Sequence, residues 1–119
     1  MSGERERAAQ PEDITRLFVE RANAGDAEGM AALYDVNAVM AYPPGKTTVG
    51  RAAIQALFAQ MLAKAPRFAP EDSLPTVRLG DLALTATRAA DAAGARAQVA
   101  RQQSDGSWLR VLDRPDFRG

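Results

Sequence analysis

The residue types that this chain lacks restrict the chemistry it can perform. Its 119 residues include no cysteine and no histidine. Without cysteine there are no disulfides, thiol nucleophiles, iron–sulfur clusters or Cys-liganded zinc. Without histidine the commonest general base and the usual zinc ligand are missing. Acid–base chemistry therefore falls to Asp, Glu, Tyr, Lys or Arg. We expect no cofactor and no metal, since no spacing of acidic residues matches a calcium loop.

Three polar residues are candidates for a site: Tyr42, Arg101 and Asp113. Tyr42 shares one face of a predicted strand with Met40, and a phenol with an ordinary pKa of about 10 acts as a hydrogen-bond donor. Arg101 and Asp113 lie in the last two predicted strands. They form a structural ion pair in one interpretation. In the other, Arg101 binds a carboxylate or carbonyl of a ligand and Asp113 orients it or acts as a base.

The turn between the last two strands decides which faces these residues occupy. A two-residue loop at Asp105-Gly106 would pair Ser104 with Ser107 and set Arg101 opposite Arg110, which is unfavourable. A type I turn over 104–106 with a glycine bulge instead gives four pairs, Gln103–Ser107, Arg101–Leu109, Val99–Val111 and Ala97–Asp113. We prefer this register because it gathers Val99, Leu109 and Val111 on the concave face, together with Arg101 and Asp113.

The same register predicts that Trp108, Arg110 and Leu112 lie on the convex face. A Trp and a Leu exposed there would be unfavourable in water. The sequence therefore predicts a homodimer through the convex face of the sheet. The alternative is a Trp that stacks locally on the aliphatic stems of Arg or Gln.

Elements of both kinds follow from periodicity and turn residues. Pro11, Asn23-Ala24-Gly25 and Asp26 delimit a first helix and the start of a second. Helices are predicted over 11–22, 27 to 33 or 34, and 51–64. Strands are predicted over 37–42, 47–49, 67–69, 76–79, 82–89, 95–103 and 108–114. Helices that come first and strands that follow indicate an α+β domain over residues 11–119, with residues 1–10 as a flexible tail.

Several motifs carry a family resemblance. They are N-A-G-D at 23–26, A-L-Y at 32–34, Y-P-P-G at 42–45, V-G-R-A-A-I at 49–54 and D-G-S-W-L-R-V-L-D-R-P at 105–115. Together they resemble the nuclear transport factor 2-like superfamily, in its SnoaL-like and ketosteroid-isomerase-like branch. The resemblance implies a cone-shaped α+β barrel with three N-terminal helices on a curved, mostly antiparallel sheet. It also implies a deep pocket at the open end and usually a homodimer.

The resemblance does not extend to the residues of steroid isomerisation. Phe18 stands where those relatives keep a tyrosine, Tyr42 where they keep the basic aspartate, and Ala95 near their second oxyanion donor. Enolisation needs a base close to the proton and donors on the oxyanion, so this mechanism is not expected. The branch implies instead a small-molecule-binding protein with a mainly apolar pocket. We expect that pocket to be lined by Phe18, Met40, Tyr42, Leu57, Met61, Val99, Arg101 and Val111.

Two other functions stay open. One is an isomerase, cyclase or hydrolase that acts on a small apolar substrate through Asp113 or Tyr42. The other is a dimeric protein-interaction module. A formal net charge of zero argues against nucleic acid as a partner, and the absence of a long apolar run argues against a membrane. We expect a cytoplasmic protein.

Overall fold

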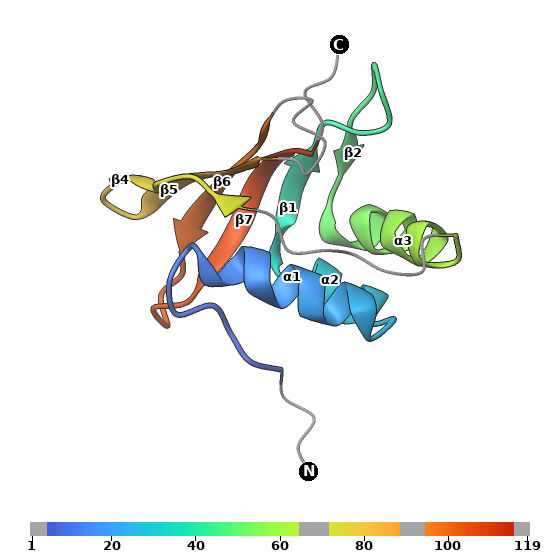
Figure 1. Ribbon diagram of the computed structural model, residues 1–119, viewed down its shortest axis with the longest axis horizontal. Coiled ribbons are helices and arrows are strands. Elements are labelled where there is room, and N and C mark those ends of the chain that lie inside the picture. Colours follow the sequence, from blue (N-terminus) through green and yellow to red (C-terminus); the bar gives the residue numbers. More distant parts are fainter. Residues whose placement is uncertain (1–4, 65–71, 89–94, 116–119) are drawn as a thin grey trace.

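Three helices lie on one side of a seven-stranded sheet (Figure 1). The computed structural model describes residues 5–64, 72–88 and 95–115. The helices are α1 (Asp13–Asn23), α2 (Ala27–Ala31) and α3 (Arg51–Leu62). The strands are β1 (Tyr34–Met40), β2 (Thr48–Val49), β3 (Asp72–Ser73), β4 (Val77–Leu79), β5 (Leu82–Arg88), β6 (Ala95–Gln102) and β7 (Trp108–Arg114). The face of the sheet toward the helices is called the inner face, and the opposite face the outer face.

The sheet joins the first long strand of the chain to the last. Its order is β2-β1-β7-β6-β5-β3, with β4 also paired to β5. Only β1 and β7 run parallel among the described strands; the remaining pairs are antiparallel. The predicted α+β class is confirmed. As far as it is described, the sheet is mixed and does not close into a barrel.

Local sequence explains the helix boundaries. The backbone at Gly25 has a positive φ of 72°, which ends α1 as predicted. Asp26 caps α2 by accepting a hydrogen bond from the Gly29 N–H at 2.9 Å. This second helix ends at Ala31, two residues earlier than predicted, and β1 begins at Tyr34 rather than 37. The A-L-Y motif therefore leads directly into the sheet.

The core lies between the helices and the inner face. Ile54 and Phe58 of α3 are buried, as are Ile14 and Leu17 of α1. Tyr34 is the largest fully buried side chain. Leu57, Met61 and Leu62 of α3 pack against this core but keep part of their surface accessible. None of the helices in the described ranges is long and apolar enough to cross a bilayer.

The predicted strands agree closely with the structure in its second half. The bounds of β7 match the prediction, and β6 ends one residue before its predicted end. Strand β5 follows the prediction over its described residues, 82–88. The two-residue strand β3 was not predicted. The strand predicted over 67–69 lies outside the described residues.

The β6–β7 hairpin follows the predicted register only near its turn. The Gln103 N–H donates to the Ser107 carbonyl at 2.7 Å, and Arg101 pairs with Leu109, both as predicted. Beyond this point a bulge inserts one extra residue, Val111, into β7.

The predicted pairs beyond the bulge are therefore wrong. Val99 pairs with Leu112 rather than Val111, and Asp113 pairs with Gln98 rather than Ala97. Because side chains alternate between faces, one extra residue changes the face of everything that follows it.

Several predicted faces of the hairpin are also wrong, although Leu112 and Asp113 lie on the faces predicted for them. Trp108 and Arg110 lie buried on the inner face, opposite the expected side, while Arg101 is exposed on the outer face. Small residues at Ala83 and Ala100 on the inner face leave room for the large Trp108 side chain. Val99 and Leu109 were expected in the core because they are apolar. The larger Trp108 side chain is buried instead, and it places its own face of the hairpin toward the helices.

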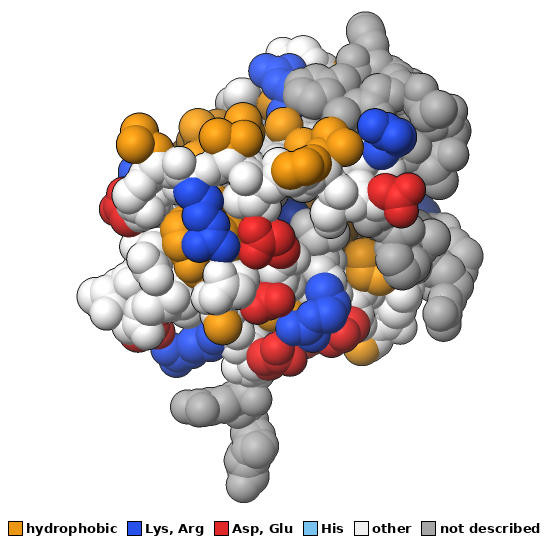
Figure 2. All heavy atoms as spheres, turned by 60° about the vertical axis from the view of Figure 1, so that its left-hand side comes forward, with side chains coloured by type: hydrophobic (Ala, Val, Ile, Leu, Met, Phe, Trp, Pro, Cys, Tyr) orange, Lys and Arg blue, Asp and Glu red, His pale blue; other side chains and the backbone are white. Residues whose placement is uncertain are grey.

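The outer face carries a continuous row of hydrophobic side chains. The row crosses six strands, and each member pairs with the next: Val49, Val39, Leu112, Val99, Leu84 and Val77. Val49, Val77, Leu84 and Leu112 are among the exposed large hydrophobic residues. Four members of the row, Val39, Leu84, Val99 and Leu112, line a cavity of about 350 Å³. Figure 2 shows hydrophobic side chains gathered along the upper side of the molecule, above a surface of mixed charge.

We predict that Phe58→Ala lowers the free energy of unfolding by about 3–5 kcal/mol. The Phe58 ring lies 5.5 Å from the Phe18 ring and 5.6 Å from the Tyr34 ring, so its loss leaves a cavity between α1, α3 and β1. Urea denaturation followed by circular dichroism measures the change. Gln60→Ala, at an exposed position of the same helix, should change stability by less than about 0.5 kcal/mol. A loss below about 1 kcal/mol for Phe58→Ala would contradict this packing.

Candidate functional site

A cluster of three polar side chains is buried at the centre of the inner face. Tyr34 of β1 and Arg110 and Asp113 of β7 are exposed by only 1%, 4% and 6%. The parallel pairing of the two strands sets Tyr34 beside Arg110, and Asp113 beside Met40. The bulge at Val111 lets Arg110 and Asp113, three residues apart, point to the same side.

The Tyr34 hydroxyl connects the two charged residues. It donates a hydrogen bond to Asp113 Oδ2 at 2.5 Å and accepts one from Arg110 Nη1 at 3.3 Å. The ion pairs of the described residues do not include Arg110 with Asp113. The phenol therefore lies between a buried cation and a buried anion, and it satisfies one atom of each.

Helix α1 supplies the remaining contacts of Arg110. The guanidinium lies 5.5 Å from the centre of the Phe18 ring and 5.8 Å from that of Tyr34, which favours the cation. Its Nη2 donates to Thr15 Oγ1 at 3.3 Å. Thr15 and Phe18 are three residues apart on α1, so both face the sheet.

Two atoms of the cluster are buried without a hydrogen-bond partner among the described residues: Arg110 Nε and Asp113 Oδ1. An unsatisfied buried polar atom destabilises a protein by about 1–3 kcal/mol. One of the two is a donor and the other an acceptor.

Burial raises the pKa of the Tyr34 phenol well above its ordinary value of about 10. The nearby negative charge of Asp113 raises it further, whereas the positive charge of Arg110 acts in the opposite direction. Tyr34 is therefore protonated at neutral pH and acts as a donor toward Asp113.

Much of the remaining inner face is polar as well. Thr85, Thr87 and Gln98 of β5 and β6 are buried there, and Thr85 Oγ1 lies 3.2 Å from Gln98 Oε1. The hydrophobic residues Phe18 and Tyr42 pack against the core but stay partly accessible. The interior thus combines apolar side chains with several polar groups. Among the described residues, no group of three or more Asp, Glu, His or Cys side chains lies together in a way that could hold a metal.

The structure separates the residues that the sequence suggested for a site. Met40 is buried on the inner face, and Phe18, Tyr42, Leu57 and Met61 pack against the core as partly buried residues. Asp113 lies on the same inner face.

The other predicted lining residues lie elsewhere. Val99 and Arg101 belong to the outer face, and Val111 is the extra residue of the bulge. An Arg101–Asp113 ion pair is therefore wrong, because the two side chains lie on opposite faces. Arg110 is the arginine that lies near Asp113, through Tyr34.

Sequence reasoning missed Tyr34, Arg110 and Thr15 as members of the cluster. Tyr34 was noted only within the A-L-Y motif, and Arg110 was expected on the convex face. An alternation of period two places residues 110 and 113 on opposite faces. No residue of β7 marks the bulge, since its extra position is an ordinary valine.

Solved structures define the fold class. A ketosteroid isomerase-like protein from Erwinia carotovora atroseptica matches with a TM-score of 0.69 and 18% identity, over 87% of this chain and 89% of that chain. A nuclear transport factor 2-like protein with a cystatin-like fold, from Novosphingobium aromaticivorans, matches with a TM-score of 0.63 and 22% identity, over 86% and 75%. A Thiobacillus denitrificans protein, named provisionally as a calcium/calmodulin-dependent protein kinase type II association domain, gives 0.71 and 20%, over 95% and 100%. The fold is that of the nuclear transport factor 2-like proteins.

The family follows from the sequence match. The model of the SnoaL-like domain matches residues 15–113, which include most of α1 and all members of the polar cluster. The chain therefore belongs to the SnoaL-like domain family, within the nuclear transport factor 2-like superfamily, as the motifs predicted. No protein of curated function matches the sequence.

We predict that Tyr34→Phe destabilises the chain at neutral pH by about 1–3 kcal/mol, since Asp113 Oδ2 loses its donor. The pKa of Tyr34 is raised in the folded state, so above pH 10 the unfolded chain releases a proton that the folded chain keeps. Wild-type stability should therefore fall as pH rises above 10, by up to about 1.4 kcal/mol per pH unit more than that of Tyr34→Phe.

Urea denaturation between pH 7 and pH 11 measures both effects. Tyr42→Phe is the matched control, and it should keep the alkaline slope because Tyr34 is still present. Identical alkaline slopes for the wild type and Tyr34→Phe would show that the Tyr34 phenol does not remain protonated in the folded state.

Proposed function

We propose that this SnoaL-like domain binds a small, mainly apolar molecule against the inner face of the sheet, at the cluster of Tyr34, Arg110 and Asp113. The observation that carries the proposal is the state of Asp113. One carboxylate oxygen is held by the Tyr34 hydroxyl, while the other is buried without a partner among the described residues. A carboxylate kept half-satisfied in an apolar interior is suited to receive a donor from a ligand.

The surrounding side chains define the chemistry of the ligand. Phe18 of α1 and Leu57 and Met61 of α3 offer partly accessible apolar surface next to the core. Asp113 Oδ1 accepts a hydrogen bond and Arg110 Nε donates one. These properties favour a compact apolar molecule that carries one hydroxyl group, which would donate to Asp113 and accept from Arg110.

A second candidate function is acid–base catalysis, with Asp113 as the base. The free oxygen of Asp113 supports it, because a general base must reach the proton that it removes. Tyr34 stays protonated and so holds the other carboxylate oxygen in place during the transfer. Tyr42 is the alternative base, but its partly buried position shows no comparable polar partner set among the described residues.

We predict that a cyclic alcohol such as cyclohexanol binds the wild type and that its parent hydrocarbon binds more weakly. Asp113→Asn should weaken binding of the alcohol about tenfold, which corresponds to the loss of one charge-assisted hydrogen bond of about 1.4 kcal/mol. Chemical shift perturbation in two-dimensional NMR measures both affinities and locates the ligand.

Asp81→Asn, in an exposed turn, is the matched control and should leave the affinity unchanged. Equal affinities for Asp113→Asn and the wild type would refute the proposed binding site. Deuterium exchange into an enolisable ketone tests catalysis separately, and equal exchange rates in the wild type and Asp113→Asn would eliminate Asp113 as a base.

We also propose that the partner of the outer face is a second copy of this chain. The hydrophobic row spans six strands, about 24 Å at the usual strand spacing, and the long strands are about 23 Å in length. A face of this size is on the scale of a standard interface, about 800 Å² per partner. In a two-fold dimer the same patch of both copies meets. An uncharged, apolar row can contact a second copy of itself in this way, because like charges are not brought together.

This proposal replaces the residues that the sequence suggested for the dimer. Trp108 and Arg110 are buried inside the domain and cannot contact a partner through the outer face, so only Leu112 is retained from that prediction. The dimer itself stays a prediction. A cytoplasmic location remains part of the proposal too.

We predict that Leu112→Asp shifts the dimerisation equilibrium toward the monomer by at least about tenfold, since it places a charge at the centre of an apolar interface. Sedimentation equilibrium at micromolar concentration measures the effect. Val36→Asp is the matched control, because Val36 is equally exposed but lies outside the row. A wild type that sediments as a monomer would rule out the dimer.

A further inference from the structure

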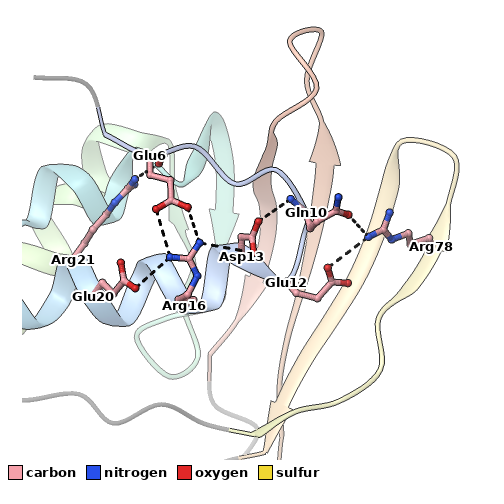
Figure 3. Close-up of polar contacts among 8 residues, drawn as sticks. All are labelled: Glu6, Gln10, Glu12, Asp13, Arg16, Glu20, Arg21 and Arg78. Atoms are coloured by element: carbon pink, nitrogen blue, oxygen red, sulfur yellow. Dashed lines mark hydrogen bonds and ion pairs between the residues drawn. The ribbon is translucent and has the colours of Figure 1, made fainter. Parts of the chain in front are cut away.

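Residues 5–10, here called the N-terminal strap, run alongside α1 and connect two distant parts of the domain (Figure 3). Near one end, Arg5 contacts Asp26 at the start of α2. Farther along, Arg7 contacts Asp105 in the turn of the β6–β7 hairpin. The strap thus lies across a region bounded by α1, α2 and the hairpin.

Charged groups make most of the contacts of the strap. Arg5 binds Asp26 through two hydrogen bonds, at 2.9 and 3.0 Å. Glu6 lies 2.7 Å from Arg16 of α1, and Arg7 lies 2.5 Å from Asp105. Figure 3 shows the Glu6 carboxylate directed at the Arg16 guanidinium. The arginines lower the pKa of Glu6, and hydrogen bonds from Arg5 do the same for Asp26.

Besides the hydrogen bonds of the Gln10 backbone with Asp13 at the start of α1, two contacts use the backbone of the strap. The Arg21 guanidinium donates to the Glu6 carbonyl, as Figure 3 also shows, and the Trp108 N–H donates to the Ala8 carbonyl at 3.0 Å. Of these two carbonyls, that of Ala8 bonds to β7 and that of Glu6 bonds to α1, so the strap does not pair with β7 as a further strand.

The strap contributes little to the hydrophobic core. Ala8 is its only buried residue, and the other five are exposed. Pro11, which follows the strap, is buried and fixes the start of α1. Burial of one methyl group stabilises a segment only slightly, at about the value of one CH₂ group. The strap is therefore held to the domain mainly by ion pairs.

A glycine makes room for the Arg5 side chain beside Asp26. Gly29 lies directly beneath the Arg5–Asp26 pair, and a Cβ atom at this position would lie 2.7 Å from Arg5 Nε and 2.1 Å from Asp26 Oδ2. Any larger residue at position 29 would displace the pair. The glycine in the first turn of α2 thus leaves the space in which the strap is anchored.

A cavity of about 520 Å³ lies beside the strap. Strap residues from Arg5 to Ala8 form one wall, Ala32 and Leu33 form another, and the hairpin residues around Trp108 complete it. Ala8 belongs to the same buried cluster as Trp108 and Leu33. Release of the strap would remove one wall of this cavity and expose Trp108.

We propose that the N-terminal strap is a salt-sensitive flap, which forms one wall of this cavity and covers Trp108 at low ionic strength, and which detaches when its ion pairs are screened. Exposed ion pairs contribute little individually and weaken with salt. The strap has almost no apolar contact with the domain, so the ion pairs that salt screens are most of the side-chain interactions that hold it in place. Buried Pro11 limits the movement to the residues that precede it.

Quenching of Trp108 fluorescence by acrylamide tests this proposal directly, since Trp108 is the only tryptophan of the chain and acrylamide is uncharged. Between 0.1 and 1 M KCl the screening length falls from about 10 to about 3 Å, and we expect the quenching constant of the wild type to rise roughly two-fold. The double variant Glu6→Gln with Asp26→Asn should show high quenching already at 0.1 M and no further rise. Asn at position 26 can still cap α2.

Glu20→Gln is the matched control, because Glu20 also contacts Arg16, at 3.2 Å, but does not hold the strap. It should follow the wild type at both salt concentrations. Far-UV circular dichroism must show that the domain stays folded in 1 M KCl. If the double variant does not fold, the salt titration of the wild type decides alone. Equal quenching of the folded wild type at 0.1 and 1 M KCl would overturn the proposal.

Discussion

The hydroxyl group of Tyr34 allows two buried charges to coexist in the centre of this domain. Arg110 and Asp113 would each be strongly unfavourable in an apolar interior if they were unpaired. The phenol accepts from one and donates to the other, and the rings of Phe18 and Tyr34 flank the guanidinium. The position of α1 over β7 depends on this arrangement, because Thr15 and Phe18 contact the same arginine. The first helix is thus attached to the last strand by a polar cluster as well as by hydrophobic packing.

The two faces of the sheet partly reverse the usual distribution of polarity, because polar groups lie beside the apolar core on the inner face. In an ordinary two-layer domain the face under the helices is apolar and the other face is polar. Here the inner face carries Thr85, Thr87, Gln98 and the Tyr34 cluster, while a row of hydrophobic side chains crosses the outer face. The reversal favours a site inside the domain and a partner outside it. It gives a common physical reason for both proposals.

The sequence predicted the elements well because local residues determine their ends. Gly25 with its positive φ, the Asp26 cap and the 104–106 turn all act within a few residues, and each is found where it was expected. The faces of β6 and β7 could not be predicted in the same way. The bulge at Val111 has no local signature, and the burial of Trp108 depends on Ala83, Ala100 and Ala8, which are distant in sequence. The candidate site was predicted least well. Only Asp113 of its charged cluster was named from the sequence, and Arg101 was named as its partner where the structure has Arg110.

The parallel pairing of β1 with β7 has a consequence for the order in which the chain can fold. These strands are separated by about two thirds of the sequence, yet they are neighbours in the middle of the sheet. During synthesis β1 has only the two residues of β2 to pair with until the last strand leaves the ribosome. The inner face stays uncovered on that side until then, and Tyr34 has neither Arg110 nor Asp113 to contact. Contacts so distant in sequence form slowly, so the domain cannot complete its fold until β7 has been synthesised.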